Sequence, residues 1–224
     1  MAIQSDKVCK INNSCFSNFC SMITDLLNIQ TVRSDLIEAS KDDSNGKAVY
    51  LYNDSRLNME CIEPDKISSH FLNYMKKQRK AVDLEQPKAV DALCIDKMNN
   101  FYMIEFKNRK LYKDEKDIEY DSDIRKDLKG KMFQTLWMLL SMDSMAESNL
   151  LGSDVIEFAR NHVVYIIVIS REKNRKENNR IHQAEAMKRH YTPDIYKKYK
   201  GYYLKDVYML TEIELGNFIR KFKT

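Results

Sequence analysis

The sequence predicts an α/β domain built on a central mixed β-sheet flanked by helices. Residues 89–96 and 101–106 form two strand-like runs separated by turn-forming residues, and 123–142 has the composition of a long helix. The run 162–170 contains VVYIIVI, which is apolar without alternation and therefore typical of a strand covered on both faces. The order strand, strand, helix, buried strand is common in α/β domains.

The other elements follow from local signals, and 224 residues are enough for a single domain that spans the chain, 1–224. Thr211 and Glu214 have the spacing of a capping box and predict the start of a C-terminal helix. Asp65 is a cap-forming residue in front of an earlier helix. The remaining predicted elements are helices over 14–28, 34–40, 66–82 and 211–222, strands over 48–52, 57–62 and 203–210, and a further segment over 155–160.

The two strands after residue 88 form a hairpin whose register can be predicted. A three-residue loop that ends at Asn99, with Asn99 in the left-handed region, is a common hairpin connection. This loop places Asp91 directly opposite Glu105, with Cβ atoms ~5 Å apart. A loop of two or four residues would instead place Asp91 opposite Phe106, unless a bulge restored the pairing.

Two opposed carboxylates repel each other, and strand periodicity puts Lys107 on the same face as Glu105. A cation held by the carboxylates, with an ammonium beside them, would relieve this conflict. The sequence therefore predicts a metal site with oxygen ligands, although a solvated face of an edge hairpin would carry the same residues.

Asp91 followed by Glu105-Phe106-Lys107 resembles the signature of the PD-(D/E)xK, or restriction-endonuclease-like, nuclease superfamily. The proline of the nominal motif is displaced to Pro87, and many members lack it. The resemblance implies a core of a helix, a three-stranded meander, a helix and a further strand. It also implies that Asp91, Glu105 and the Phe106 carbonyl hold Mg²⁺ (or Mn²⁺), and that Lys107 positions or deprotonates the attacking water.

Gln134 is the one long polar side chain in the apolar run MFQTLWMLLSM of the predicted helix, which we expect to be buried. In the resembled family a glutamine or other polar residue on this helix faces the active site, so Gln134 is a further catalytic candidate. Met138 stands where the recombination nucleases have tyrosine, so that subgroup does not fit. A core glutamine bonded to a backbone carbonyl is the alternative interpretation.

The family also carries an acid on the helix before its first strand, and Glu38 is our candidate for a further metal ligand. Asp25, Glu60 and Glu63 compete with it, and each of the four also reads as a solvated surface acid. The predicted helix 66–82 would then be an insertion between the first two core strands.

Charge is distributed unevenly, although the formal net charge is only +4. Residues 171–200 hold ten Lys or Arg against four Asp or Glu, with Tyr191, Tyr196 and Tyr199 between them. Such a stretch can follow a phosphate backbone and stack on bases, or it can be a solvated helix and loop. The candidate nucleic-acid contacts are Arg109 and Lys110 after the motif, and Lys188, Arg189, Lys197 and Lys198 in this stretch.

Five scattered cysteines without a C-x-x-C pair support neither a zinc site nor an iron–sulfur cluster, and the four histidines show no ligand spacing. With no membrane-length apolar run and no signal peptide, we expect a cytoplasmic protein without membrane contact. The expected activity is Mg²⁺-dependent hydrolysis of nucleic acid, DNA in preference to RNA, by a possible homodimer. The alternative is a non-catalytic domain that keeps this fold and binds nucleic acid or a protein.

Overall fold

The computed structural model describes residues 14–42, 48–79, 83–113, 119–148, 150–152 and 154–223. Its centre is a six-stranded mixed sheet in the order β1-β4-β5-β6-β7-β8, which confirms the predicted sheet class. β1, β4, β5 and β6 pair antiparallel, whereas β6, β7 and β8 run parallel. The strands are β1 (Arg33–Asp35), β4 (Glu60–Ile62), β5 (Ala92–Ile95), β6 (Phe101–Lys107), β7 (Val163–Ile169) and β8 (Asp206–Thr211), and a separate pair is formed by β2 (Lys41–Asp42) and β3 (Val49–Tyr50).

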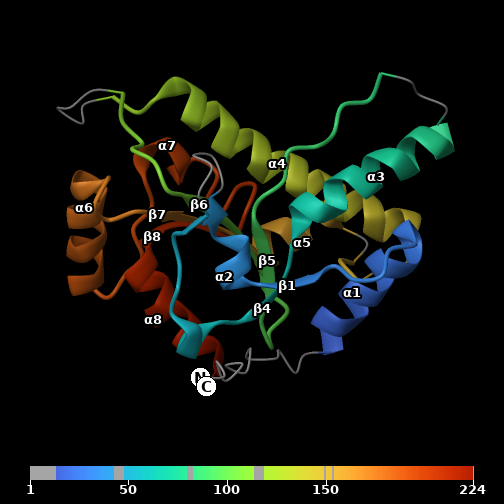
Figure 1. The fold of residues 1–224 in the computed structure, drawn as a ribbon, viewed down its shortest axis with the longest axis horizontal. Coiled ribbons are helices and arrows are strands. Elements are labelled where there is room, and N and C mark those ends of the chain that lie inside the picture. Colours follow the sequence, from blue (N-terminus) through green and yellow to red (C-terminus); the bar gives the residue numbers. More distant parts are fainter. Residues whose placement is uncertain are drawn as a thin grey trace.

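Helices cover both faces of the sheet (Figure 1). The larger core cluster joins α1, α3 and α4 to alternate residues of β5 to β8, and the smaller one joins α2 and α8 to the residues between them. The helices are α1 (Ser14–Leu27), α2 (Leu36–Ala39), α3 (Pro64–Arg79), α4 (Ser122–Met145), α5 (Val155–His162), α6 (Arg175–Ala186), α7 (Asp194–Lys197) and α8 (Glu212–Lys223), with one 3₁₀ turn, η1 (Ser55–Leu57).

The β5–β6 hairpin has the predicted register. Ala92 pairs with Ile104 and Ile95 with Phe101, and Asn99 adopts a φ of 59° in the left-handed region. The Asp96 carboxylate accepts the backbone N–H groups of residues 98 and 100, which closes the three-residue loop. The predicted capping box of α8 is also present, since Thr211 and Glu214 exchange backbone-to-side-chain hydrogen bonds at 3.1 and 3.4 Å.

Several predicted elements differ in extent. The helix predicted over 34–40 is shorter, because 33–35 forms β1 and Asp35 caps α2. Asp65 lies in the first turn of α3 and not at its cap, while the end of that prediction, 80–82, lies outside the described residues. Only 60–62 of the strand predicted over 57–62 is a strand, because residues 55–57 form η1.

The helix α4 is not buried all round, so that expectation is wrong. Phe133 and Trp137 are 37% and 52% exposed, and the side chain of Gln134 is exposed as well. The helix lies on one face of the sheet, and its outer side therefore meets solvent.

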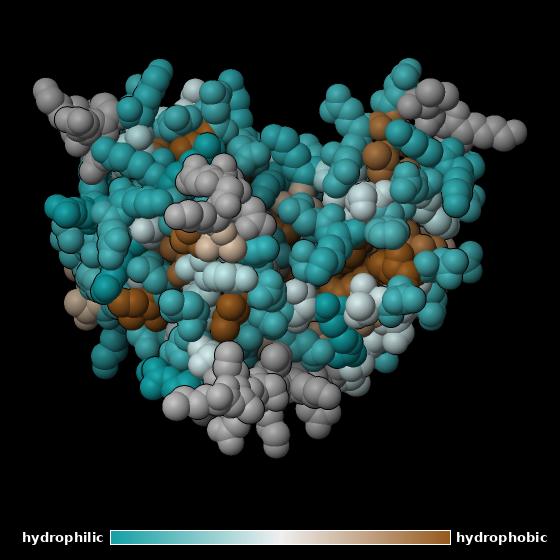
Figure 2. Space-filling view, viewed as in Figure 1, coloured by the Kyte–Doolittle hydropathy of each residue, from teal (hydrophilic) through white to brown (hydrophobic). Residues whose placement is uncertain are grey.

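The surface is largely hydrophilic on the face drawn in Figure 2, and hydrophobic side chains gather toward the right, where α1 and the C-terminal end of α4 lie. Among the described helices, none combines the length and the apolar composition that crossing a bilayer requires.

Candidate metal centre

Asp91 and Glu105 converge on one point, as the hairpin register predicts. The Nζ atom of Lys131, on α4, lies 3.2 Å from Asp91 Oδ1 and 2.9 Å from Glu105 Oε1. The backbone N–H of Phe106 donates to Asp91 Oδ2 at 2.6 Å, so the Asp91 carboxylate is fixed against β6 just before β5 begins. One cation therefore already bridges the two carboxylates.

Lys107 extends this contact into a chain of alternating charges. Its Nζ lies 3.0 Å from Glu105 Oε1 and 2.9 Å from Asp127 Oδ2, and Lys88 Nζ lies 3.0 Å from the other Asp127 oxygen. The chain runs Asp91, Lys131, Glu105, Lys107, Asp127, Lys88. Three carboxylates and three ammoniums thus alternate along the hairpin and α4.

Burial makes these charges sensitive to their partners. The Glu105 side chain is 0% exposed, and its burial together with the charge of Asp91 raises the pKa of Glu105 to about 8. Burial also raises the pKa of Asp91. Although burial opposes the charged form of Lys131 as well, Glu105 and Asp91 hold the pKa of its ammonium above the ordinary lysine value. The pair of carboxylates therefore favours a cation between them.

The sequence brings these groups together through two periodicities. Residues 105 and 107 share the face of β6 that packs under α4, because successive strand residues alternate between faces. On α4, Asp127 and Lys131 are four residues apart and so lie on one side of the helix. The polar side of α4 therefore meets the polar end of β6.

Two neighbouring residues of α4 anchor the segment that leads to Asp91. The Gln134 Oε1 atom accepts the backbone N–H of Lys88 at 2.7 Å, and Thr135 Oγ1 accepts that of Val90 at 2.9 Å. Thr135 is fully buried, whereas Gln134 is exposed and does not line the cleft around Asp91. The polar contact predicted for Gln134 exists, but its partner is a backbone donor outside the cleft.

An open cleft of about 570 Å³ contains the acidic pair. Arg109 and Lys173 contribute positive charge to its wall, while Lys110 is not among its lining residues. The cleft is lined by Ser40, Lys41, Asp42, Asp91, Glu105, Phe106, Lys107, Asn108, Arg109, Lys131 and Lys173.

A second cleft, of about 370 Å³, shares Asp91 and Lys41 with the first and holds the upstream acids. Glu38, Glu63 and Asp65 line it, and Glu63 is paired with Lys66 at 2.6 Å. Glu60 is paired with Arg33 at 2.8 Å and Asp25 lies on α1, and neither lines either cleft. Glu38 and Asp91 thus share a cleft, and Asp65, which was expected only as a helix cap, lines it as well.

The basic stretch is divided between elements. Arg189 and Lys197 line a separate cleft between α6, α7 and β8, where Lys197 is paired with Asp194 at 2.6 Å. Lys188 has a positive φ of 54° at the end of α6, and the Lys198 ammonium lies over the Tyr199 ring. Tyr196 and Tyr199 are 0% and 7% exposed, so these two tyrosines pack in the core and have no free face for a base.

The oxygen donors of this site fit Mg²⁺. Both side-chain ligands are carboxylates that contact the same ammonium, and Phe106 lines the same cleft. Glu105 Oε1 is fully buried and faces two ammoniums within 3.0 Å, so this oxygen lies in a position that favours a cation.

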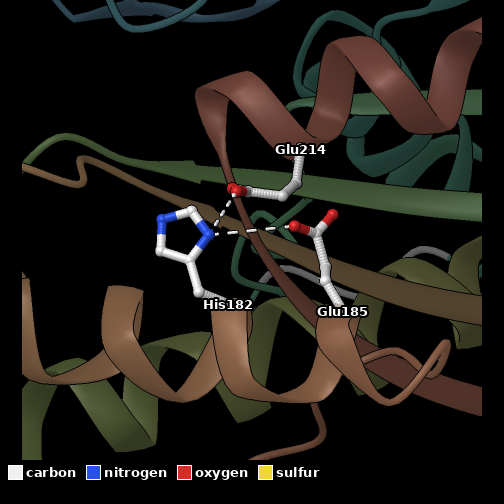
Figure 3. Close-up of side chains that lie close together, drawn as sticks. All are labelled: His182, Glu185 and Glu214. Carbon is white, nitrogen blue, oxygen red and sulfur yellow. Dashed lines mark ion pairs between the residues drawn. The ribbon is translucent and has the colours of Figure 1, made fainter.

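A second group of possible ligands comprises His182 and Glu185 on α6 and Glu214 on α8 (Figure 3). His182 Nδ1 lies 3.8 Å from Glu185 and 3.5 Å from Glu214. The other Glu214 oxygen caps α8, and His182 and Glu185 are exposed, so ion pairing and capping account for the group. Sequence spacing alone does not predict this group, because Glu214 lies on a different helix from His182 and Glu185.

Lys131 and Asp127 were not predicted from the sequence as members of this site. Their spacing of four on a predicted helix that follows the motif is a usable signal, since it places an ammonium and a carboxylate on one face. Comparison of the chain with protein-family models, curated proteins and solved structures gives no match.

Proposed function

We propose that this protein is a Mg²⁺-dependent nuclease of restriction-endonuclease-like type that hydrolyses phosphodiester bonds in DNA. The observation that carries the proposal is the convergence of Asp91 and Glu105 on one cation position, with the Lys107 ammonium 3.0 Å from the shared Glu105 oxygen. A metal cation supplies the charge that stabilises a phosphodiester during hydrolysis and lowers the pKa of bound water.

The arrangement of elements supports the same class. A helix precedes a meander of β4, β5 and β6, and α4 and the parallel strand β7 follow it. This is the order that the resembled superfamily implies, with the acidic pair on the central hairpin. The helix α3 lies between β4 and β5 as the inserted element.

Each residue has a distinct task in this proposal. Asp91, Glu105 and the Phe106 carbonyl would hold Mg²⁺ (or Mn²⁺), with Glu38 as a further acid across the adjoining cleft. Lys107 is held between Glu105 and Asp127, and its ammonium orients the attacking water toward phosphorus. Arg109 and Lys173 border the cleft where the phosphate backbone would lie.

The substrate and the oligomeric state are also part of this proposal. DNA is preferred to RNA on the strength of the resemblance alone, and cleavage of both strands would favour a homodimer.

A non-catalytic domain of the same fold, which binds nucleic acid or a protein, is the second candidate. The alternating chain of three carboxylates and three ammoniums favours it, because each carboxylate already has an ammonium partner without a metal. Cleavage and binding assays separate the two candidates.

The test is Mg²⁺- and Mn²⁺-dependent cleavage of varied DNA and RNA substrates by the unaltered protein and by Asp91→Ala, Glu105→Ala and Lys107→Met. We expect the two carboxylate variants to lose cleavage and metal binding, and Lys107→Met to lose cleavage while it still binds metal and duplex. Asp123→Asn is the control, because it removes an acid that is 87% exposed at the start of α4. Absence of cleavage by the unaltered protein, with equal nucleic-acid binding by all variants, would leave only the binding domain.

A further inference from the structure

The position of Lys131 supports an inference about how metal enters the site, which rests on the proposed function. Its ammonium contacts Asp91 at 3.2 Å and both oxygens of Glu105 at 2.9 and 3.0 Å, and its side chain is 18% exposed. We propose that this ammonium occupies the cation position between the two carboxylates and must withdraw before Mg²⁺ or Mn²⁺ can bind there. Lys131 then acts as a built-in competitor of the metal.

Geometry makes the two cations compete for the same carboxylates. A Mg²⁺ ion bound by both carboxylates stands at about 2.0–2.1 Å from an oxygen of each. The Lys131 nitrogen already lies 2.9–3.2 Å from oxygens of the same two carboxylates, so the two positive centres would be no more than about 5 Å apart. Charges that close repel strongly where the side chains are as buried as these.

Charge balance points to the same ammonium. Each carboxylate of the chain already has an ammonium partner, so a divalent cation adds positive charge to the network, and withdrawal of one ammonium reduces that excess. Lys107 is held by Asp127 as well as by Glu105, so it has a partner that the metal does not take. Among the ion pairs of the described residues, Lys131 takes part only in those with Asp91 and Glu105, the two proposed ligands.

The adjoining cleft offers the displaced ammonium a destination. Asp65 interacts electrostatically with Lys131 and lines that cleft beside Glu38 and Glu63. An ammonium that swings from the Glu105 pair toward these acids keeps opposite charges near it. Metal binding therefore exchanges one cation for another at the carboxylates and need not leave Lys131 unpaired.

Titration calorimetry with MnCl₂ and MgCl₂ tests this directly, without any cleavage assay. Removing the ammonium in Lys131→Met should increase Mn²⁺ affinity by about tenfold or more, because a charge within ~4–6 Å typically changes an ionic equilibrium by that order. Lys126→Met is the matched control. It removes one ammonium from the same helix, where the Lys126 side chain is 78% exposed, pairs with Asp123 at 3.9 Å and does not line the cleft, and it should leave the affinity close to its original value.

A second variant tests whether a change in metal binding could result from loss of the fold. Lys131→Gln removes the charge but keeps hydrogen-bond donors for the carboxylates, and the rise in melting temperature on adding MnCl₂ should be larger in this variant than in the unaltered protein. Equal or weaker Mn²⁺ binding by both Lys131 variants would overturn the inference while the proposed function stands. Failure of every variant and of the unaltered protein to bind metal would overturn the proposed function itself and the inference with it.

Discussion

Asp127 shows how a single side chain fixes the candidate site without belonging to the motif. Its oxygens contact Lys107 at 2.9 Å and Lys88 at 3.0 Å. Although burial opposes its charged form, the hydrogen bonds from these lysines lower the pKa of Asp127 to about 2. Asp127 therefore links α4 to the hairpin and to the segment before β5 through two hydrogen-bonded ion pairs.

This depressed pKa predicts a pH-dependent contribution to stability. The ionised form is favoured in the folded protein, so the stabilisation is complete above about pH 4 and is lost as the pH falls toward 2. We expect Asp127→Asn to reduce the free energy of unfolding by about 1–2 kcal/mol at pH 7, since one pKa unit corresponds to about 1.4 kcal/mol and solvent screens a partly exposed ion pair. The difference from the unaltered protein should shrink below pH 4 in urea titrations. A difference that stays constant between pH 7 and pH 3 would contradict this account, and the exposed Asp123→Asn is the control.

At the level of elements, the hairpin could be predicted and the orientation of α4 could not. The register of β5 and β6 depends on the turn between them, with Asn99 in the left-handed region. The residues that favour such a turn can be recognised in a sequence. Which side of α4 faces the sheet depends on packing across the whole core. The prediction that Gln134 is buried was therefore wrong by one position, since its neighbour Thr135 is the buried residue. For the same reason Lys131 was missed.

The contact between α4 and the segment before Asp91 gives a prediction for Thr135. Its hydroxyl is the acceptor for the buried Val90 N–H, so Thr135→Val leaves that donor without a partner. We expect a loss of about 1–3 kcal/mol in the free energy of unfolding, measured by urea denaturation. Thr135→Ser keeps the hydroxyl and should recover most of the loss that is due to the hydrogen bond. Gln134→Ala should cost less than Thr135→Val, because water can replace an exposed amide; the reverse order would contradict this reading of the interface.

At the scale of the whole molecule, the distribution of basic residues determines where a nucleic acid would bind. The formal net charge of +4 is small, so position matters more than the total. Arg109 and Lys173 line the cleft of the acidic pair, whereas Arg189 and Lys197 line the cleft at α6, α7 and β8. The linear sequence could locate the basic stretch but not its distance from the candidate metal site, because that depends on how β8 and the helices beside it pack on the sheet.

Salt dependence of binding distinguishes these two surfaces. Each phosphate contact that is lost lowers the slope of log affinity against log salt by about one. Arg109→Gln with Lys173→Gln should therefore reduce the slope by about two in fluorescence titrations of duplex DNA. The combined change Lys188→Gln, Arg189→Gln, Lys197→Gln and Lys198→Gln should reduce it by less than four, because Lys197 is already paired with Asp194 at 2.6 Å.

If the combined change leaves the slope unaltered while the cleft pair reduces it, the stretch after β7 is a solvated face and the duplex contacts only the cleft. If neither change alters the slope, phosphate contact by these residues is ruled out, and with it the proposed path of the substrate.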